Sequence, residues 1–190
     1  MQTNRFETFF DAIIAIIMTI LILKISQPSD PTLSAIWSSR VSYIAYLISF
    51  LTLFNVWYSN HNLFHKVDEL NNRVVAIYGI LIFILSLNPY FTMWVALNIE
   101  SIPAETTYGL LFIIVNVLYI ISIKLLYWSN PYNEELQEYN CSLARQMSPL
   151  IAILIGFILT YTIFKPGIYY CCLIAIIWWI AIDWRNVNEN

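Results

Sequence analysis

Near its start the chain reads Arg5-Phe-Glu-Thr-Phe-Phe-Asp-Ala-Ile-Ile-Ala-Ile-Ile-Met-Thr-Ile-Leu-Ile-Leu-Lys24. Only the twelve residues 12–23 of this stretch run without a charged side chain, whereas a helix needs about 20 apolar residues to cross a bilayer. A crossing helix must therefore bring Asp11 close to or into the apolar layer. Because an ionisable group there is costly unless it faces a partner or water, Asp11 is a candidate functional residue. The presence of Asp11 favours a position for this helix inside a helix bundle or along the wall of a channel.

The composition of the whole chain is that of a membrane protein. Of its 190 residues, 59% are hydrophobic and 11% are charged, against about 25% charged residues in soluble proteins. No long polar block interrupts the chain, so we expect a single transmembrane domain over residues 1–190. The net charge is only −3 and no basic patch stands out, so a nucleic acid is not an expected partner.

Apolar segments predict an all-α integral membrane protein with six transmembrane helices. These segments cover residues 6–25, 40–62, 73–97, 105–127, 147–164 and 167–184. The sequence Lys165-Pro166-Gly167 separates the last two and predicts a tight reversal, because Pro and Gly interrupt helices. Pro89, which follows Asn88, predicts a kink or an early helix end within the third segment.

The Lys and Arg residues predict the orientation of these segments. With six crossings, one side of the membrane receives both termini and most of the basic residues, namely Arg5, Lys66, Arg73, Lys124, Arg145 and Arg185. The other side receives Lys24, Arg40 and Lys165. Because Lys and Arg are enriched on the cytoplasmic side, we expect a multi-pass protein of the plasma membrane with both termini in the cytoplasm.

The helical period places Ile16, Thr19 and Leu23 on one face of the first helix. Two interpretations of this face remain open. In the first, it is an ordinary packing face of a structural membrane protein. In the second, copies of the chain around a cyclic axis bring the face together as stacked rings. Rings of Ile and Leu then form a hydrophobic constriction, which gates by dewetting.

The start of the first segment resembles the signature of a known family. The residues Arg5-x-x-x-Phe9-Phe10-Asp11, followed by a helix rich in Ile, Leu and Thr, are similar to an R-x-x-x-F-S-D motif. That motif opens the bacterial single-repeat branch of the endolysosomal potassium channel family, transmembrane protein 175. The serine of the motif is Phe10 here, so the local hydrogen-bond network must differ. Lys24 stands where the family often has an acidic residue, and a ring of lysines at the outer mouth would oppose cations.

A second motif, on segment 40–62, supports this resemblance. It is similar to the family pattern S-F…W-x-x-N-H and consists of Ser49, Phe50, Trp57, Asn60 and His61. Each motif is weak alone, but the two stand in the family's order and at its separation within a six-segment chain. The resemblance covers the first half of the chain by motif and the second half by hydropathy.

The resemblance implies a potassium-preferring cation channel, a homotetramer in which the first helices line a central pore. Carried onto this sequence, it implies a constriction at Ile16, Thr19 and Leu23, with Lys24 at the pore mouth. It also implies a set of side chains that anchors the first helix to the second, consisting of Arg5, Phe9, Asp11, Asn60 and His61. The expected partners are permeant K⁺ and the lipid bilayer. No cofactor is expected, because the ion gradient supplies the free energy.

Other functions find less support in the residues. A proton-coupled secondary transporter would use Asp11 at an alternating-access site, but it predicts an internal repeat or helices broken at mid-membrane, and neither is clear. An enzyme is not expected, because the Glu134-Glu135 pair lies in a polar stretch and lacks intramembrane His partners. His61 and His65 are four residues apart, the spacing of two metal ligands on one helix face. No Cys or third His joins them, so the sequence favours hydrogen bonding at a helix end over a bound metal.

Overall fold

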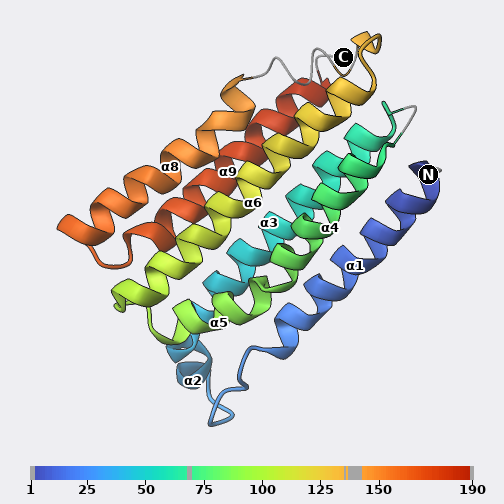
Figure 1. The fold of residues 1–190 in the computed structure, drawn as a ribbon. Coiled ribbons are helices and arrows are strands. Elements are labelled where there is room, and N and C mark those ends of the chain that lie inside the picture. Colours follow the sequence, from blue (N-terminus) through green and yellow to red (C-terminus); the bar gives the residue numbers. More distant parts are fainter. Residues whose placement is uncertain (1–2, 68–69, 135, 137–142, 189–190) are drawn as a thin grey trace.

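The computed structural model describes residues 3–67, 70–134, 136 and 143–188, and this part of the chain is all-α (Figure 1). Long helices lie side by side and alternate in direction, so that both ends of the chain reach the same end of the bundle (Figure 1). The helices are α1 (Thr3–Leu23), α2 (Leu33–Ser38), α3 (Arg40–Phe64), α4 (Asn72–Ser86), α5 (Asn88–Leu97), α6 (Ile102–Ser129), α8 (Leu143–Thr162) and α9 (Gly167–Asn188). Glu135, one of the paired glutamates named above, lies outside the described residues.

Within the described residues, four helical stretches are long and apolar enough to cross a membrane. They are Thr3–Leu23, Arg40–Phe64, Asn72–Leu97 and Ile102–Ser129. The apolar parts of α8 and α9 are shorter, at Pro149–Thr162 and Gly167–Trp178. The described residues therefore confirm an all-α protein with several helices that are candidates to span a membrane, whereas the crossing of α8 and α9 stays a prediction.

The predicted interruption at Pro89 is confirmed. α4 ends at Ser86 and α5 begins at Asn88, with Pro89 in the first turn of the new helix. Pro is tolerated there because the first N–H groups of a helix have no intrahelical acceptor. The Thr92 hydroxyl donates to the backbone carbonyl of Asn88 at 2.7 Å, one turn further along α5.

Three buried hydroxyl groups close to this interruption join three helices. The Thr92 Oγ1 atom on α5 lies 2.6 Å from Ser49 Oγ on α3. Ser49 Oγ also lies 3.1 Å from the hydroxyl oxygen of Tyr108 on α6. All three side chains are buried. Ser49, a residue of the second motif, therefore stands where α3, α5 and α6 meet.

The reversal at Lys165-Pro166-Gly167 is also confirmed, since α8 ends at Thr162 and α9 begins at Gly167. Two glycines bring the helices of this hairpin close together. A Cβ atom on Gly156 would lie 2.9 Å from Cys171 Cβ, and one on Gly167 would lie 2.9 Å from the backbone nitrogen of Thr160. Small residues permit this close approach of two membrane helices.

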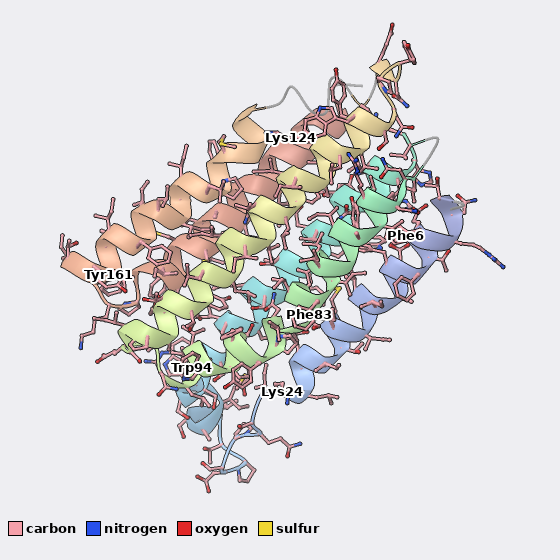
Figure 2. The ribbon with its side chains drawn as sticks, viewed as in Figure 1. Phe6, Lys24, Phe83, Trp94, Lys124 and Tyr161 are labelled. Carbon is pink, nitrogen blue, oxygen red and sulfur yellow. The ribbon has the colours of Figure 1, made fainter. Side chains whose placement is uncertain are left out.

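Labelled side chains mark the two ends of the bundle. Figure 2 shows Lys24 at the same end as Trp94 and Tyr161, whereas Phe6 and Lys124 lie toward the opposite end. Lys24 and Lys124, which the sequence predicts on opposite sides of the membrane, thus lie toward opposite ends of the bundle (Figure 2). Which end faces the cytoplasm stays a prediction.

Candidate functional site

α1 turns one face toward the bundle and leaves the other uncovered. It packs against α3, α4 and α5. Its buried side chains are those of Phe6, Phe10, Ile14, Ile17 and Leu21. On the opposite face, Ile16 is 56% exposed, Leu23 is 80% exposed, and Thr19 between them is exposed too. The three residues predicted to form a constriction thus share an apolar face that no other described helix covers.

The polar groups on this face are few. The Thr19 hydroxyl donates to the backbone carbonyl of Ile16 at 2.8 Å, so its oxygen retains lone pairs that point away from the helix backbone. Lys24 is exposed and directly follows the end of α1. The exposed face therefore combines apolar side chains, one hydroxyl oxygen and a positive charge at the end of the helix.

Phe10, the departure from the signature, is a packing residue. Its side chain is 0% exposed. Its ring packs edge-on against Tyr78 on α4, with 5.6 Å between the ring centroids, and against Phe64 on α3, with 6.2 Å between the centroids. Such edge-to-face pairs add to the stabilisation from apolar burial. A large ring thus fills the position where the motif has a hydroxyl.

Asn60, a residue of the predicted anchor, is buried and connects α3 to α4. Its Oδ1 atom accepts a hydrogen bond of 2.6 Å from the hydroxyl of Tyr78. Its Nδ2 atom donates to the backbone carbonyl of Val56 at 2.7 Å. Tyr78 also packs against Phe6 and Phe10 of α1. Asn60 therefore positions a ring that contacts α1, and these two hydrogen bonds of its own do not reach α1.

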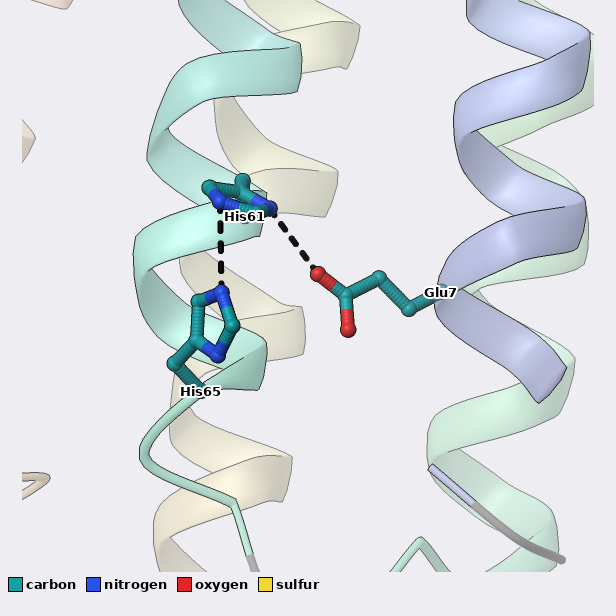
Figure 3. A group of neighbouring side chains, drawn as sticks. All are labelled: Glu7, His61 and His65. Carbon is teal, nitrogen blue, oxygen red and sulfur yellow. Dashed lines mark hydrogen bonds and ion pairs between the residues drawn. The ribbon is translucent and has the colours of Figure 1, made fainter. Parts of the chain in front are cut away.

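Two histidines and one carboxylate form the contact between α1 and the end of α3. The His61 Nδ1 atom lies 3.0 Å from Glu7 Oε1. The other ring nitrogen of His61, Nε2, lies 3.2 Å from Nε2 of His65 (Figure 3). His61 is therefore held on both sides, by an acidic residue of α1 and by the second histidine of α3.

Asp11 lies one helical turn beyond Glu7 and has a partner of its own. The side chain of Trp57 on α3 lies close enough to interact with the Asp11 carboxylate, and its indole N–H can only donate. The Trp57 ring also stacks on the His61 ring, with 5.7 Å between the centroids and 15° between the planes. The Asp11 carboxylate thus faces a hydrogen-bond donor of the protein, the indole of Trp57.

The other two residues of the predicted anchor lie on the surface. Phe9 is 54% exposed and Arg5 is exposed as well. Glu7, in contrast, makes a direct contact with α3 that the motif comparison did not predict. The spacing of Glu7 and Asp11, four residues apart on one face of a helix, was the signal in the sequence that could have indicated it.

Comparisons with known proteins show which family this chain resembles. The sequence model of the family described as endosomal/lysosomal potassium channel TMEM175 matches residues 5–89, a range that contains both motifs. A potassium channel of Chryseobacterium sp. (strain P1-3) is 28% identical over 195 residues, which cover 100% of this chain and 100% of that protein. The predicted resemblance to the TMEM175 family is confirmed.

Two further proteins are similar to this chain in part of their sequence or in their fold. A potassium channel of Chamaesiphon minutus is 25% identical over 127 residues, which cover 62% of this chain and 63% of that protein. The crystal structure of a lysosomal potassium-selective channel TMEM175 homolog from the same organism matches with a TM-score of 0.78 at 22% identity. That match covers 92% of this chain and 94% of the other. The similarity in fold thus extends beyond Pro89, where the match to the family's sequence model ends.

Proposed function

We propose that this chain forms a potassium-preferring cation channel, a homotetramer in which four α1 helices line a central pore. The observation that carries the proposal is the uncovered apolar face of α1 with Ile16, Thr19 and Leu23. Exposure alone is compatible with contact to lipid. The same helix, however, carries the family motif, and proteins matched over the whole chain or a large part of it are named potassium channels.

The proposed pore follows from the spacing of these residues. Ile16 and Leu23 are seven residues apart, which corresponds to about 10 Å along a helix axis. Around a four-fold axis they would form two apolar rings with a ring of Thr19 hydroxyl oxygens between them. Narrow apolar rings exclude water and so set the barrier for an ion. The oxygens of Thr19 would offer polar contacts to K⁺ between the two barriers.

The proposed arrangement has six membrane crossings. α8 contains 20 residues, and a helix of that length measures about 30 Å, the thickness of the hydrocarbon core. α9 contains 22 residues and is long enough by the same measure. With six crossings both termini lie on one side of the membrane. The excess of Lys and Arg on that side favours the cytoplasm, with the protein in the plasma membrane.

The contacts of α1 with α3 would anchor the proposed pore helix. Glu7–His61 and Asp11–Trp57 lie in the N-terminal half of α1, whereas Ile16, Thr19 and Leu23 lie in the remainder. The polar contacts would hold one half against the bundle, while the other half presents the apolar rings. Arg5 and Phe9 are exposed, so any anchoring contacts of these two residues would come from another subunit.

Nothing in the part of the chain that the structure describes favours a proton-coupled transporter over a channel, and the matched proteins are named as channels. Channels are in general not enzymes, which agrees with the sequence-based expectation for this chain. The remaining alternative is a structural membrane protein in which α1 serves only for packing. In that case, substitutions at Ile16 and Leu23 would not change ion flux.

Potassium efflux from liposomes that contain the purified protein tests the proposal. Ile16→Asn and Leu23→Asn each place an amide in an apolar ring, so we expect the potassium flux or the K⁺-to-Na⁺ flux ratio to change. Ile155→Asn on α8, where Ile155 is 49% exposed, is the matched control and should conduct as the wild type does. Unchanged flux in folded Ile16 and Leu23 variants, or a monomeric state by native mass spectrometry, would contradict the proposal.

A further inference from the structure

We propose that His61 and His65, positioned by Glu7, bind a divalent transition-metal ion such as Zn²⁺. The site lies where the N-terminal part of α1 meets the end of α3 (Figure 3). Each of the three residues offers one ligand-type atom, and these atoms lie within 4.8 Å of one another. This inference goes beyond the proposed channel and does not depend on it.

The two histidines already have the spacing of two ligands of one ion. They are one helical turn apart, which places side chains next to each other on a helix face. Their Nε2 atoms are 3.2 Å apart. In a tetrahedral site with Zn–N bonds of about 2.0–2.1 Å, two ligand nitrogens are about 3.3 Å apart. In the absence of metal, one of the two Nε2 atoms must carry a proton to make this hydrogen bond. A metal ion would take the place of that proton.

Glu7 selects the ring nitrogen of His61 that faces the ion. Its Oε1 atom lies 3.0 Å from His61 Nδ1. A carboxylate that accepts a hydrogen bond from Nδ1–H leaves the lone pair of the neutral ring on Nε2, the atom that faces His65. Metal-binding histidines are commonly oriented by a carboxylate in this way. Glu7 is therefore a positioning residue, and water completes the coordination of the ion.

Other contacts restrain His61 and keep the site accessible. Stacking on Trp57 limits rotation of the His61 ring. The His61 side chain is 39% exposed, the Glu7 side chain is 13% exposed, and His65 is exposed. An ion can thus reach the nitrogens from solvent, while the carboxylate that orients the ring is largely shielded. Imidazole donors select Zn²⁺, Cu²⁺ or Ni²⁺ over Mg²⁺, Ca²⁺ and K⁺, which prefer oxygen ligands.

Zn²⁺ binding to tag-free protein in detergent tests the inference by isothermal titration calorimetry and thermal unfolding. A Cys141→Ser background removes a thiol, at a position outside the described residues, that could also bind Zn²⁺. We expect one Zn²⁺ per chain and a rise in unfolding temperature with Zn²⁺ concentration, because a ligand of the folded state stabilises it. Mg²⁺ should give neither effect.

Variants of the cluster assign the binding to these side chains. His65→Gln and Glu7→Gln should each weaken Zn²⁺ binding by about 10-fold to 100-fold. His65 is exposed, so its variant should unfold at the wild-type temperature without metal. Asn62→Gln, on the same turn of α3, is the control and should bind Zn²⁺ as the parent does. With Cu²⁺, electron paramagnetic resonance should detect two imidazole nitrogens in the parent and one in His65→Gln.

Two results would overturn the inference. One is an absence of Zn²⁺ binding at millimolar concentration, and the other is unchanged binding in folded His65→Gln protein. Unchanged binding in Glu7→Gln would overturn the positioning role of Glu7. Potassium flux does not enter these measurements, so their outcome is independent of the test of the proposed channel.

Discussion

The Glu105 carboxylate on α6 accepts a hydrogen bond of 2.8 Å from the backbone N–H of Tyr169 in the first turn of α9. The neighbouring N–H of Ile168 donates to the hydroxyl oxygen of Thr160 on α8 at 2.9 Å. The first N–H groups of a helix have no acceptor within the helix, and in an apolar layer there is no water to replace it. Side chains of two other helices thus cap α9, and this capping joins α6, α8 and α9.

Removal of the Glu105 carboxylate should destabilise the bundle. Glu105 is 0% exposed, so Glu105→Leu leaves the Tyr169 N–H without its acceptor at a cost of about 1–3 kcal/mol. Glu105→Gln keeps an acceptor oxygen and should cost less. Thermal unfolding in detergent measures both effects. Glu100→Leu, at an exposed position just before α6, is the control, and an equal loss in Glu100→Leu and Glu105→Leu would contradict the capping role.

Gly156→Ala should destabilise the α8–α9 hairpin. The added Cβ would lie 2.9 Å from Cys171 Cβ and 3.0 Å from Ile168 Cα, so the helices must move apart at a cost of about 1–3 kcal/mol. Gly79 on α4 has no atom within 4 Å of such a Cβ. There Ala should be neutral or stabilising by up to about 1 kcal/mol, because Ala favours helix. Thermal unfolding measures both effects. An equal change in unfolding temperature for Gly156→Ala and Gly79→Ala would contradict the close approach at Gly156.

Phe10→Ser restores the serine of the family motif and should destabilise this chain. The buried Phe10 ring fills space between Phe64 and Tyr78, and loss of a buried Phe ring costs about 3–5 kcal/mol. Phe9→Ser changes a neighbouring ring that is 54% exposed and should have a much smaller effect. Chemical unfolding monitored by Trp fluorescence compares the two. A stable Phe10→Ser protein would mean that a hydroxyl suits the site as well as the ring does.

Lys24→Glu should raise potassium efflux by a few-fold if α1 lines the pore. The change replaces a ring of positive charges at the pore mouth with carboxylates, which concentrate cations. The increase should shrink in high salt, because at 1 M ionic strength the screening length falls to about 3 Å. Lys165→Glu makes the same change in the α8–α9 turn, on the far side of the bundle from α1 (Figure 1), and should leave efflux unchanged. Equal effects of the two substitutions would place Lys24 away from the conduction path.

Helix positions and their interruptions followed from the sequence. The predicted segments 6–25 and 40–62 correspond to α1 and α3, and the interruption at Pro89 and the reversal at Gly167 lie where the residues predicted them. These features depend on local chemistry. An apolar run long enough to span the bilayer must form a helix to satisfy its backbone, and Pro or Gly interrupts it wherever it stands.

Side-chain partners across the bundle did not follow from the sequence. Glu7 and His61 are 54 positions apart. The spacing of Glu7 and Asp11 indicates that they share a helix face, but it does not identify His61 as the partner of Glu7. Glu105 and Tyr169 meet across a longer separation of 64 positions. The sequence predicted that Asp11 needs a partner, and the structure identified Trp57.

The sequence by itself determined that this chain is a bundle of apolar helices with a charged first segment. Long apolar runs in a bilayer must satisfy their backbone hydrogen bonds internally, and a helix does so. Only the tertiary structure decided which face of each helix is buried. In lipid, apolar side chains are equally suited to neighbouring helices and to acyl chains. Hydropathy therefore could not show that Phe10 lies inside the bundle while Ile16 and Leu23 lie outside it, and that difference depends on how α1 packs against α3 and α4.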